Sequence, residues 1–162
     1  MACRMPLFLR LYLLPVLIIF LQAAPVRAGT AVDRVCNADD PVRLQVVVSG
    51  LRAASGNVTI MLYGDNRQDF LKKGGRLVRI RVPAQAGDVR VCVPAPAPGS
   101  YALSLYHDED GNKKLTKNWL GLPTEGYGFS RDAAVSYRLP ELEEAVFTAL
   151  PGDTPVPITM RY

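Results

Sequence analysis

Short apolar runs separated by turn-forming residues follow one another along the chain after residue 40. The segment 44–48 is β-branched and lies between such residues, which is typical of a strand. Its three consecutive valines predict burial on both faces. The segment 58–63 carries apolar residues at alternate positions, with the two-residue period of a strand.

Further strands are expected at regular intervals, and the segment 100–107 alternates most cleanly. One of its faces carries Tyr101, Leu103, Leu105 and His107, and the other carries Ala102, Ser104 and Tyr106. Brief helical turns are expected after Asp65 and from Pro140. The other expected strands are 77–82, 89–93, 134–139, 145–150 and 156–162.

Seven or eight short strands and no long helical period predict an all-β fold, a β-sandwich of antiparallel strands with one or two helical turns. An open Greek-key barrel is the alternative. Pro155 and Pro157 place the start of the final strand at a sheet edge. These prolines, with the unbroken valine run at 46–48, argue against the strict alternation of an outer-membrane barrel.

The first 28 residues are typical of a secretory signal peptide. Arg4 and Arg10 give a positive start, residues 11–21 form an apolar run, and small residues precede a cleavage site after Ala28. The sequence therefore predicts export to the periplasm or the extracellular space. The expected organisation is a signal peptide over 1–28, an irregular lead-in over 29–41 and one β-sandwich domain over 42–162.

Removal of the signal peptide changes the charge of the chain. Three of the 19 basic residues leave and all 15 acidic residues stay, so the net charge falls from +4 to about +1. Because no run of Lys and Arg is longer than two, the concentrated basic footprint of a nucleic-acid-binding protein is missing. The expected partner is a protein or an envelope component, with no stable membrane insertion after cleavage.

Two cysteines, Cys36 and Cys92, remain after cleavage. An exported protein enters a compartment in which disulfides form, so these two are expected to pair. Two buried free thiols are the alternative.

The segment 108–116 carries oxygen-bearing side chains with the spacing of a calcium-binding loop. Relative positions 1, 3, 5 and 9 are Asp108, Asp110, Asn112 and Thr116. The position of a sharp-turn glycine holds Lys113, however, and Trp119 stands where a bidentate glutamate belongs. The sequence thus predicts a weak site for Ca²⁺ or a similar cation, and a tight polar loop is the alternative.

His107 is the only histidine and adjoins this loop. An enzyme of hydrolase type would have to use His107, Asp108, Asp110 and Glu125 as its polar cluster. The strand period puts Ser104 on the opposite face from His107, so no nucleophile stands beside it. We therefore expect a non-enzymatic binding or structural module and assign no catalytic residue.

A glycine- and aromatic-rich segment spans residues 121–130. It predicts either a cover packed over the acidic loop for its own stability or a shallow surface for a ligand or partner. In the second case the contact residues are Trp119, Glu125, Tyr127 and Phe129.

Several motifs together resemble the DUF2141 family of exported bacterial proteins of unknown function. The most specific are H-D-E-D-G-N-x-K-L over 107–115 and N-W-L-G-L-P-x-E-G-Y-G-F-S over 118–130. G-L-x-x-x-x-G-N-V over 50–58, Phe70-Leu71 and P-G-S-Y over 98–101 accompany them. The resemblance covers about residues 42–162 and implies a β-sandwich of immunoglobulin- or transthyretin-like type, with no established activity. Relative to the usual loop of the family, Lys113 replaces a glycine and Thr116 an aspartate.

Overall fold

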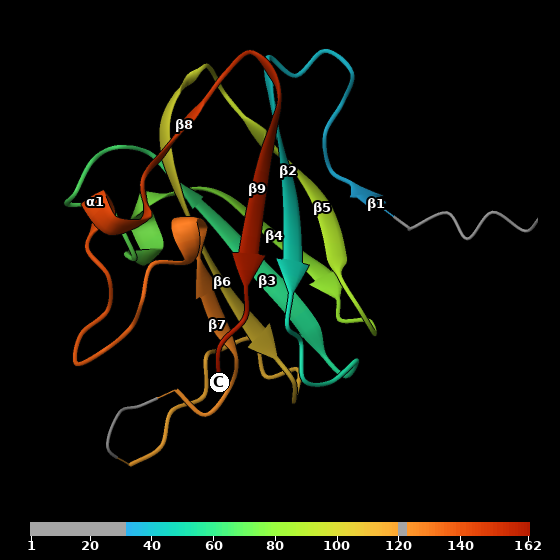
Figure 1. Ribbon diagram of the computed structural model, residues 1–162, viewed down its shortest axis with the longest axis vertical. Coiled ribbons are helices and arrows are strands. Elements are labelled where there is room, and N and C mark those ends of the chain that lie inside the picture. Colours follow the sequence, from blue (N-terminus) through green and yellow to red (C-terminus); the bar gives the residue numbers. More distant parts are fainter. Residues whose placement is uncertain (1–31, 120–122) are drawn as a thin grey trace, which may run out of the picture.

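The computed structural model describes residues 32–119 and 123–162, and within them nine strands form two sheets stacked as two layers (Figure 1). The predicted signal peptide, residues 1–28, lies outside the described residues. None of the helices within the described ranges is long and apolar enough to cross a membrane.

The first sheet has four strands in the order β1 (Val32–Arg34), β5 (Val89–Ala95), β2 (Val42–Ser49) and β9 (Gly152–Thr159). β2 pairs antiparallel with β5 and parallel with β9, and β1 pairs parallel with β5. The lead-in before residue 42, expected to be irregular, thus contributes a strand. β9 is an edge strand, as its prolines predict.

The second sheet has five strands, four of them in the order β4 (Arg76–Pro83), β3 (Asn57–Tyr63), β6 (Gly99–Asp108) and β7 (Tyr127–Phe129). All of its pairings are antiparallel, and β8 (Phe147–Ala149) joins the first residues of β6. β6 is the longest strand, with ten residues. It carries the acidic loop at its carboxyl end.

The inner faces of the two sheets share one apolar core, which confirms the predicted two-sheet, mostly β architecture. The prediction that all strands are antiparallel was wrong, because β1 pairs parallel with β5 and β2 pairs parallel with β9. β2 buries alternate residues rather than both faces, because Val46 and Val48 point into the core while Val47 is half-buried. On β6, Leu103 and Leu105 face the core, as the alternation predicts. Each such aliphatic side chain contributes about 1.5–3 kcal/mol when it is fully buried.

A second, smaller apolar cluster covers the outer face of the five-stranded sheet. Leu142 and Ala145 of the short helix α1 (Leu142–Ala145) belong to it. Two further short helices, η1 (Lys73–Gly75) and η2 (Ser130–Asp132), precede β4 and follow β7. Glu141 and Glu144 form a reciprocal capping box at α1, the turn expected from Pro140. In the earlier turn, Asn66 rather than Asp65 accepts the hydrogen bond of the Gln68 N–H.

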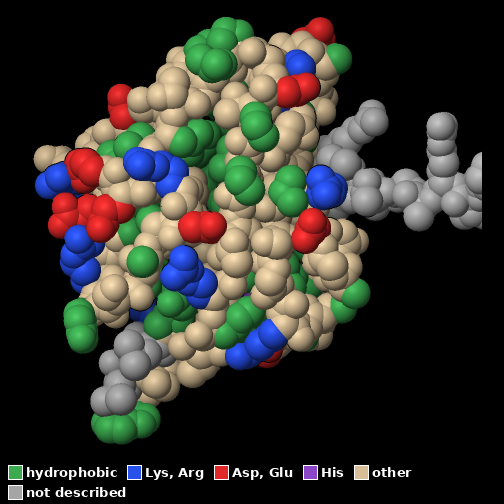
Figure 2. All heavy atoms as spheres, viewed as in Figure 1, with side chains coloured by type: hydrophobic (Ala, Val, Ile, Leu, Met, Phe, Trp, Pro, Cys, Tyr) green, Lys and Arg blue, Asp and Glu red, His purple; other side chains and the backbone are tan. Residues whose placement is uncertain are grey.

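The segment 134–139, expected as a strand, is irregular. Its Tyr137 and Leu139 side chains are exposed, so the alternation does not correspond to a buried face. Around α1, acidic and basic side chains lie next to one another (Figure 2). Ion pairs join Arg67 to Glu143 and Arg138 to Glu144 there.

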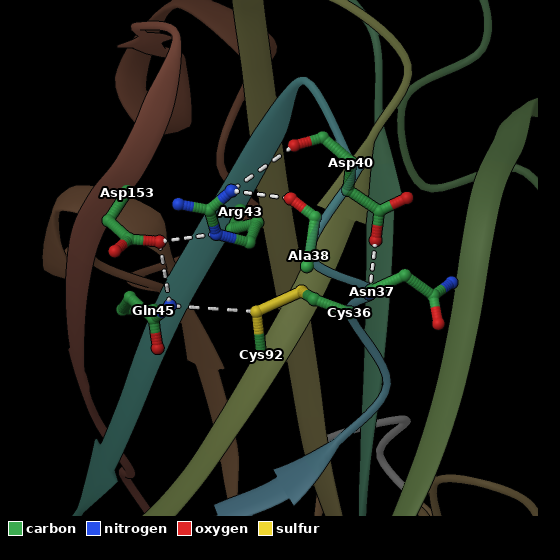
Figure 3. Close-up of a disulfide and its surroundings, with 8 residues drawn as sticks. All are labelled: Cys36, Asn37, Ala38, Asp40, Arg43, Gln45, Cys92 and Asp153. Carbon is green, nitrogen blue, oxygen red and sulfur yellow. Dashed lines mark hydrogen bonds and ion pairs between the residues drawn. A yellow bond between two sulfur atoms is a disulfide. The ribbon is translucent and has the colours of Figure 1, made fainter.

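The predicted disulfide is present between Cys36 and Cys92, whose Cα atoms are 5.5 Å apart (Figure 3). It ties the lead-in to β5. Beside it, the Gln45 amide contacts the Cys92 sulfur at 3.6 Å, and Arg43 pairs with Asp153 at 2.8 Å (Figure 3).

The two sheets also meet at one corner. The backbone of Tyr127 in β7 exchanges two hydrogen bonds of 2.8 Å with the backbone of Arg161, which follows β9. This bridge brings Tyr162 beneath the loop that follows β6.

Candidate functional site

The acidic loop begins where β6 ends, and glycine lets its backbone lie close to a neighbouring turn. Asp108 pairs in register with Asn57. Gly56, with a φ of +72°, sits so close to the backbone of Asp108 and Glu109 that a Cβ atom would clash with both. The start of the loop is therefore held against the turn before β3.

His107 anchors the loop from within the core. Its side chain is fully buried, its Nε2–H donates to the Ser55 carbonyl at 2.8 Å, and its Nδ1 lies 2.8 Å from the Tyr162 hydroxyl. Because a carbonyl only accepts, Nε2 carries the proton and Nδ1 accepts from Tyr162. Both ring nitrogens are thus engaged in holding the structure together.

Arg52 contacts both Glu109 and Tyr162 beside the buried His107. Its guanidinium pairs with both carboxylate oxygens of Glu109, at 2.7 and 3.1 Å, and lies 4.3 Å from the centre of the Tyr162 ring. The hydrogen bond to Glu109 raises the pKa of Arg52. Burial raises the pKa of the Tyr162 hydroxyl, which also accepts the Arg52 backbone N–H at 3.0 Å.

Three carboxylates, two from the loop and one from the segment after it, lie close together. Asp108, Asp110 and Glu125 each offer an oxygen, and these atoms lie within 4.8 Å of one another. Glu125 is 5% exposed and accepts the backbone N–H of Glu109 at 3.0 Å and of Thr116 at 2.8 Å. These two hydrogen bonds therefore hold both ends of the loop next to the Glu125 carboxylate.

Asp108 is fully buried, and its two oxygens differ. Oδ2 accepts the Lys113 N–H at 3.0 Å and forms an ion pair with Arg81. Oδ1 is buried and has no hydrogen-bond partner among the residues that the structure describes. A buried carboxylate oxygen without a partner carries a desolvation cost of about 1–3 kcal/mol or more, which a bound cation would offset.

Within the loop, side-chain hydrogen bonds hold the backbone in turns like those of a cation-binding loop. The Asn112 side-chain amide donates to Asp110 Oδ2 at 2.7 Å and to Thr116 Oγ1 at 2.9 Å, and the Lys114 N–H donates to Asn112 Oδ1. Lys113 has a φ of +67°, in the region that favours glycine, as the spacing predicts for this position. The predicted donors Asn112 and Thr116 are thus bonded within the loop.

Glu125 joins Asp108 and Asp110 in the structure, as the polar cluster of the alternative hydrolase prediction grouped them, although the loop spacing alone did not select it. Glu125 lies beside the two aspartates, whereas Trp119, at the loop position where a glutamate belongs, has a side chain that is 90% exposed. A contiguous loop pattern does not reveal an acid that returns from a later segment. The available signal was a single acid amid glycines and aromatics.

The four residues of the predicted ligand surface differ in their exposure to solvent. Glu125 and Phe129 are buried, Tyr127 is half-buried, and Trp119 points into solvent. A Cβ atom on Gly126 would lie 2.6 Å from the Tyr162 ring, so glycine permits that ring to cover the backbone. The described part of the segment is packed as a cover, and its buried members do not form one exposed surface with Trp119.

One of the comparisons with known proteins identifies a family for the chain. A family model described as an uncharacterized protein conserved in bacteria, DUF2141, matches residues 46–157. No curated protein and no solved structure matches the chain.

Proposed function

The chain belongs to the DUF2141 family, and we propose that it is a non-enzymatic, exported β-sandwich module of immunoglobulin- or transthyretin-like type whose acidic loop binds a divalent cation. Calcium is the cation that suits this loop best. The module would serve the cell envelope, with the cation fixing the loop after β6.

One observation carries the proposal: the unpartnered, buried Oδ1 of Asp108 beside the oxygens of Asp110 and Glu125. Oδ2 of Asp108 is already held by Arg81 and the Lys113 N–H, which leaves Oδ1 as the free ligand atom. Glu125 keeps lone pairs beyond its two backbone hydrogen bonds, since a carboxylate has about four acceptor sites.

The donor set consists of oxygens alone, which Ca²⁺ and Mg²⁺ prefer. Mg²⁺ demands near-ideal octahedral geometry, whereas Ca²⁺ accepts six to eight ligands in flexible arrangements that include water and backbone carbonyls. The cationic side chains of Arg81 and Lys113 oppose the ion. We therefore expect an affinity of about 10⁻⁴–10⁻³ M, as in extracellular calcium modules.

Two features support an exported protein. Disulfides such as Cys36–Cys92 persist in oxidising compartments and are rare in the cytosol. The signal-peptide pattern of residues 1–28 points to the same compartments.

The surroundings of His107 favour a module over a hydrolase. A general base must reach the proton that it abstracts. His107 is fully buried with both ring nitrogens bonded, and it lies outside the group formed by Asp108, Asp110 and Glu125.

Calorimetric titration of Ca²⁺ into the exported chain tests the proposal. Binding is expected at submillimolar to millimolar Ca²⁺. Asp110→Asn should weaken it about tenfold, because it removes a charged ligand at an exposed position. Asp65→Asn, an exposed carboxylate on another loop, is the matched control and should bind as the parent does. Absence of heat and of any thermal shift at about 10 mM Ca²⁺, or equal loss in both variants, would refute the site.

A further inference from the structure

A cavity of about 490 Å³ lies on the outer face of the five-stranded sheet. Its floor is formed by β4, β3, β6 and β7, and its walls by the turn before β4 and by the loop after β6. Small-molecule sites have volumes of roughly 300–1,000 Å³. The cavity is therefore large enough for a ligand, and Asp108, Asp110 and Glu125 do not line it.

The floor of the cavity is a row of side chains in register across four strands. Arg79 pairs with Met61, Met61 with Ser104, and Ser104 with Phe129. Residues directly opposite one another on neighbouring strands point to the same face of the sheet. The aromatic residues Tyr63, Tyr106, Tyr127 and Phe129 extend this floor. Such a surface suits an apolar chain or ring.

Ser104 places an unsatisfied polar group in this apolar floor. The residue is 4% exposed, it lines the cavity, and its hydroxyl has no hydrogen-bond partner in the part of the chain that the structure describes. Its in-register neighbours Met61 and Phe129 offer no strong donor or acceptor. Because buried polar groups are nearly always bonded, this hydroxyl points to a ligand oxygen within the cavity.

The rim of the cavity is strongly basic. Its lining includes six cationic residues and, among the described residues, no carboxylate. None of the six forms an ion pair with any carboxylate that the structure describes. The six are Lys73, Arg76, Arg79, Lys113, Lys114 and Lys117. Uncompensated charge of one sign around a cleft attracts ligands of the opposite sign.

Two of the rim cations are placed by the sheet. Arg79 donates through Nη2 to the Tyr106 hydroxyl at 3.0 Å, which holds its guanidinium beside the floor. Nε of Arg76 is buried and has no hydrogen-bond partner within the described chain. Guanidinium groups form the strongest, often bidentate, contacts with carboxylates and phosphates.

We propose that this cavity binds an amphiphilic anion, a small molecule with one carboxylate or phosphate group on an apolar chain. The head group would contact Arg76 and Arg79, and the chain would lie over Met61 and Phe129. An inorganic anion would leave the aromatic floor unused, and a neutral apolar molecule would leave the cations unpaired. The proposal is independent of the cation site.

The test is a calorimetric titration of the exported chain with four probes. They are dodecanoate and dodecyl phosphate, both below their micellar concentrations, dodecyl maltoside, and inorganic phosphate. At least one of the anionic amphiphiles should bind about tenfold more tightly than the neutral detergent or inorganic phosphate, because charged hydrogen bonds add to apolar burial. The better of the two identifies the head group. Binding should persist in a chelator of divalent cations.

Two variants locate the site. Ser104→Val fills the floor and should weaken binding about tenfold or more, whereas Thr59→Val should not. Thr59 is an equally buried residue with an unpartnered hydroxyl that does not line the cavity. Arg76→Gln with Arg79→Gln should also weaken binding about tenfold, against Lys72→Gln with Arg90→Gln as control.

The Arg76→Gln, Arg79→Gln double variant and its control keep the test decisive if Ser104→Val fails to fold. The proposal is overturned if none of the probes binds, or if the neutral detergent binds as tightly as the anions. It is also overturned if inorganic phosphate alone matches them, or if the rim variants bind as their controls do.

Discussion

At the scale of single residues, the acidic loop requires a left-handed backbone conformation at Lys113, where the residue is not glycine. Lys113 adopts a φ of +67° and donates its N–H to Asp108. A non-glycine residue in this left-handed region carries a cost of about 1–2 kcal/mol. Lys113 also brings a positive charge to the loop that holds the carboxylates.

Lys113→Gly should therefore improve both properties of the loop. Relief of the left-handed backbone, less the added chain entropy of glycine, should raise the free energy of unfolding by about 0.5 kcal/mol. Loss of the nearby charge should tighten Ca²⁺ binding about threefold. Urea unfolding and calorimetry measure the two effects. Lys114→Gly, at a residue without positive φ, should instead destabilise the chain; equal effects of the two changes would contradict this account.

Tyr162 links the anchor of the loop to pH. Burial raises the pKa of its hydroxyl above the unfolded value of about 10. The folded state therefore favours the neutral phenol, so its contribution is complete below pH 10 or so and is lost as pH rises through the folded pKa. We expect the free energy of unfolding to decline above about pH 10.

Tyr162→Phe should remove part of this alkaline decline. It should also destabilise the chain near neutral pH by about 1–3 kcal/mol, because Nδ1 of the buried His107 loses its partner. Urea unfolding across a pH series measures both effects, with Tyr137→Phe, at a fully exposed tyrosine, as the control. An unchanged alkaline slope in Tyr162→Phe would show that the decline has another origin.

At the scale of elements, the disulfide holds the lead-in and β1 to the sheet. Cys36 and Cys92 are 56 residues apart, and closing a loop of that length removes about 4 kcal/mol of unfolded-state entropy on the chain-entropy model. The bond lies at the side of β5 that faces away from the shared core, next to Gln45 (Figure 3).

Replacement of both Cys36 and Cys92 by Ser should lower the free energy of unfolding by about 4 kcal/mol. Guanidinium chloride unfolding measures the change, and reduction of the parent chain should reproduce it. A stability equal to that of the oxidised parent would mean that the disulfide contributes nothing to the stability of the folded domain.

Strands with strong alternation were predictable from sequence, whereas short or weakly patterned ones were not. On β6, the division between Leu103 and Ser104 was correct because one face meets the shared core and the other meets the outer cluster. β7 has only three residues and Gly128 at its centre, so it carried no strand signal. The expected strand at 134–139 failed because its alternation does not correspond to burial.

At the scale of the whole molecule, the functional groups converge from distant parts of the chain. Asp108 and Asp110 were predicted from their spacing, but Arg81 and Glu125 reach them only through the pairing of β4 with β3 and the return of the chain into β7. The basic cavity was not predicted at all. Its cations come from a turn, a strand and a loop, and only the strand register aligns Arg79 with Ser104.

The loop after β6 lies between the two proposed sites. Its carboxylates gather around Glu125, while Lys113 and Lys114 of the same loop line the basic cavity. Charges of opposite sign are thus separated across a few residues. This separation explains why a net charge of about +1 over residues 29–162 conceals both sites.

A crystal structure of residues 29–162, grown in about 10 mM Ca²⁺, tests the cation site most directly. We predict an anomalous difference peak bonded to Oδ1 of Asp108 and to oxygens of Asp110 and Glu125, with Oδ2 of Asp108 still paired to Arg81. An ordered loop without such a peak, or with Oδ1 of Asp108 bonded to a protein donor instead, would contradict the account.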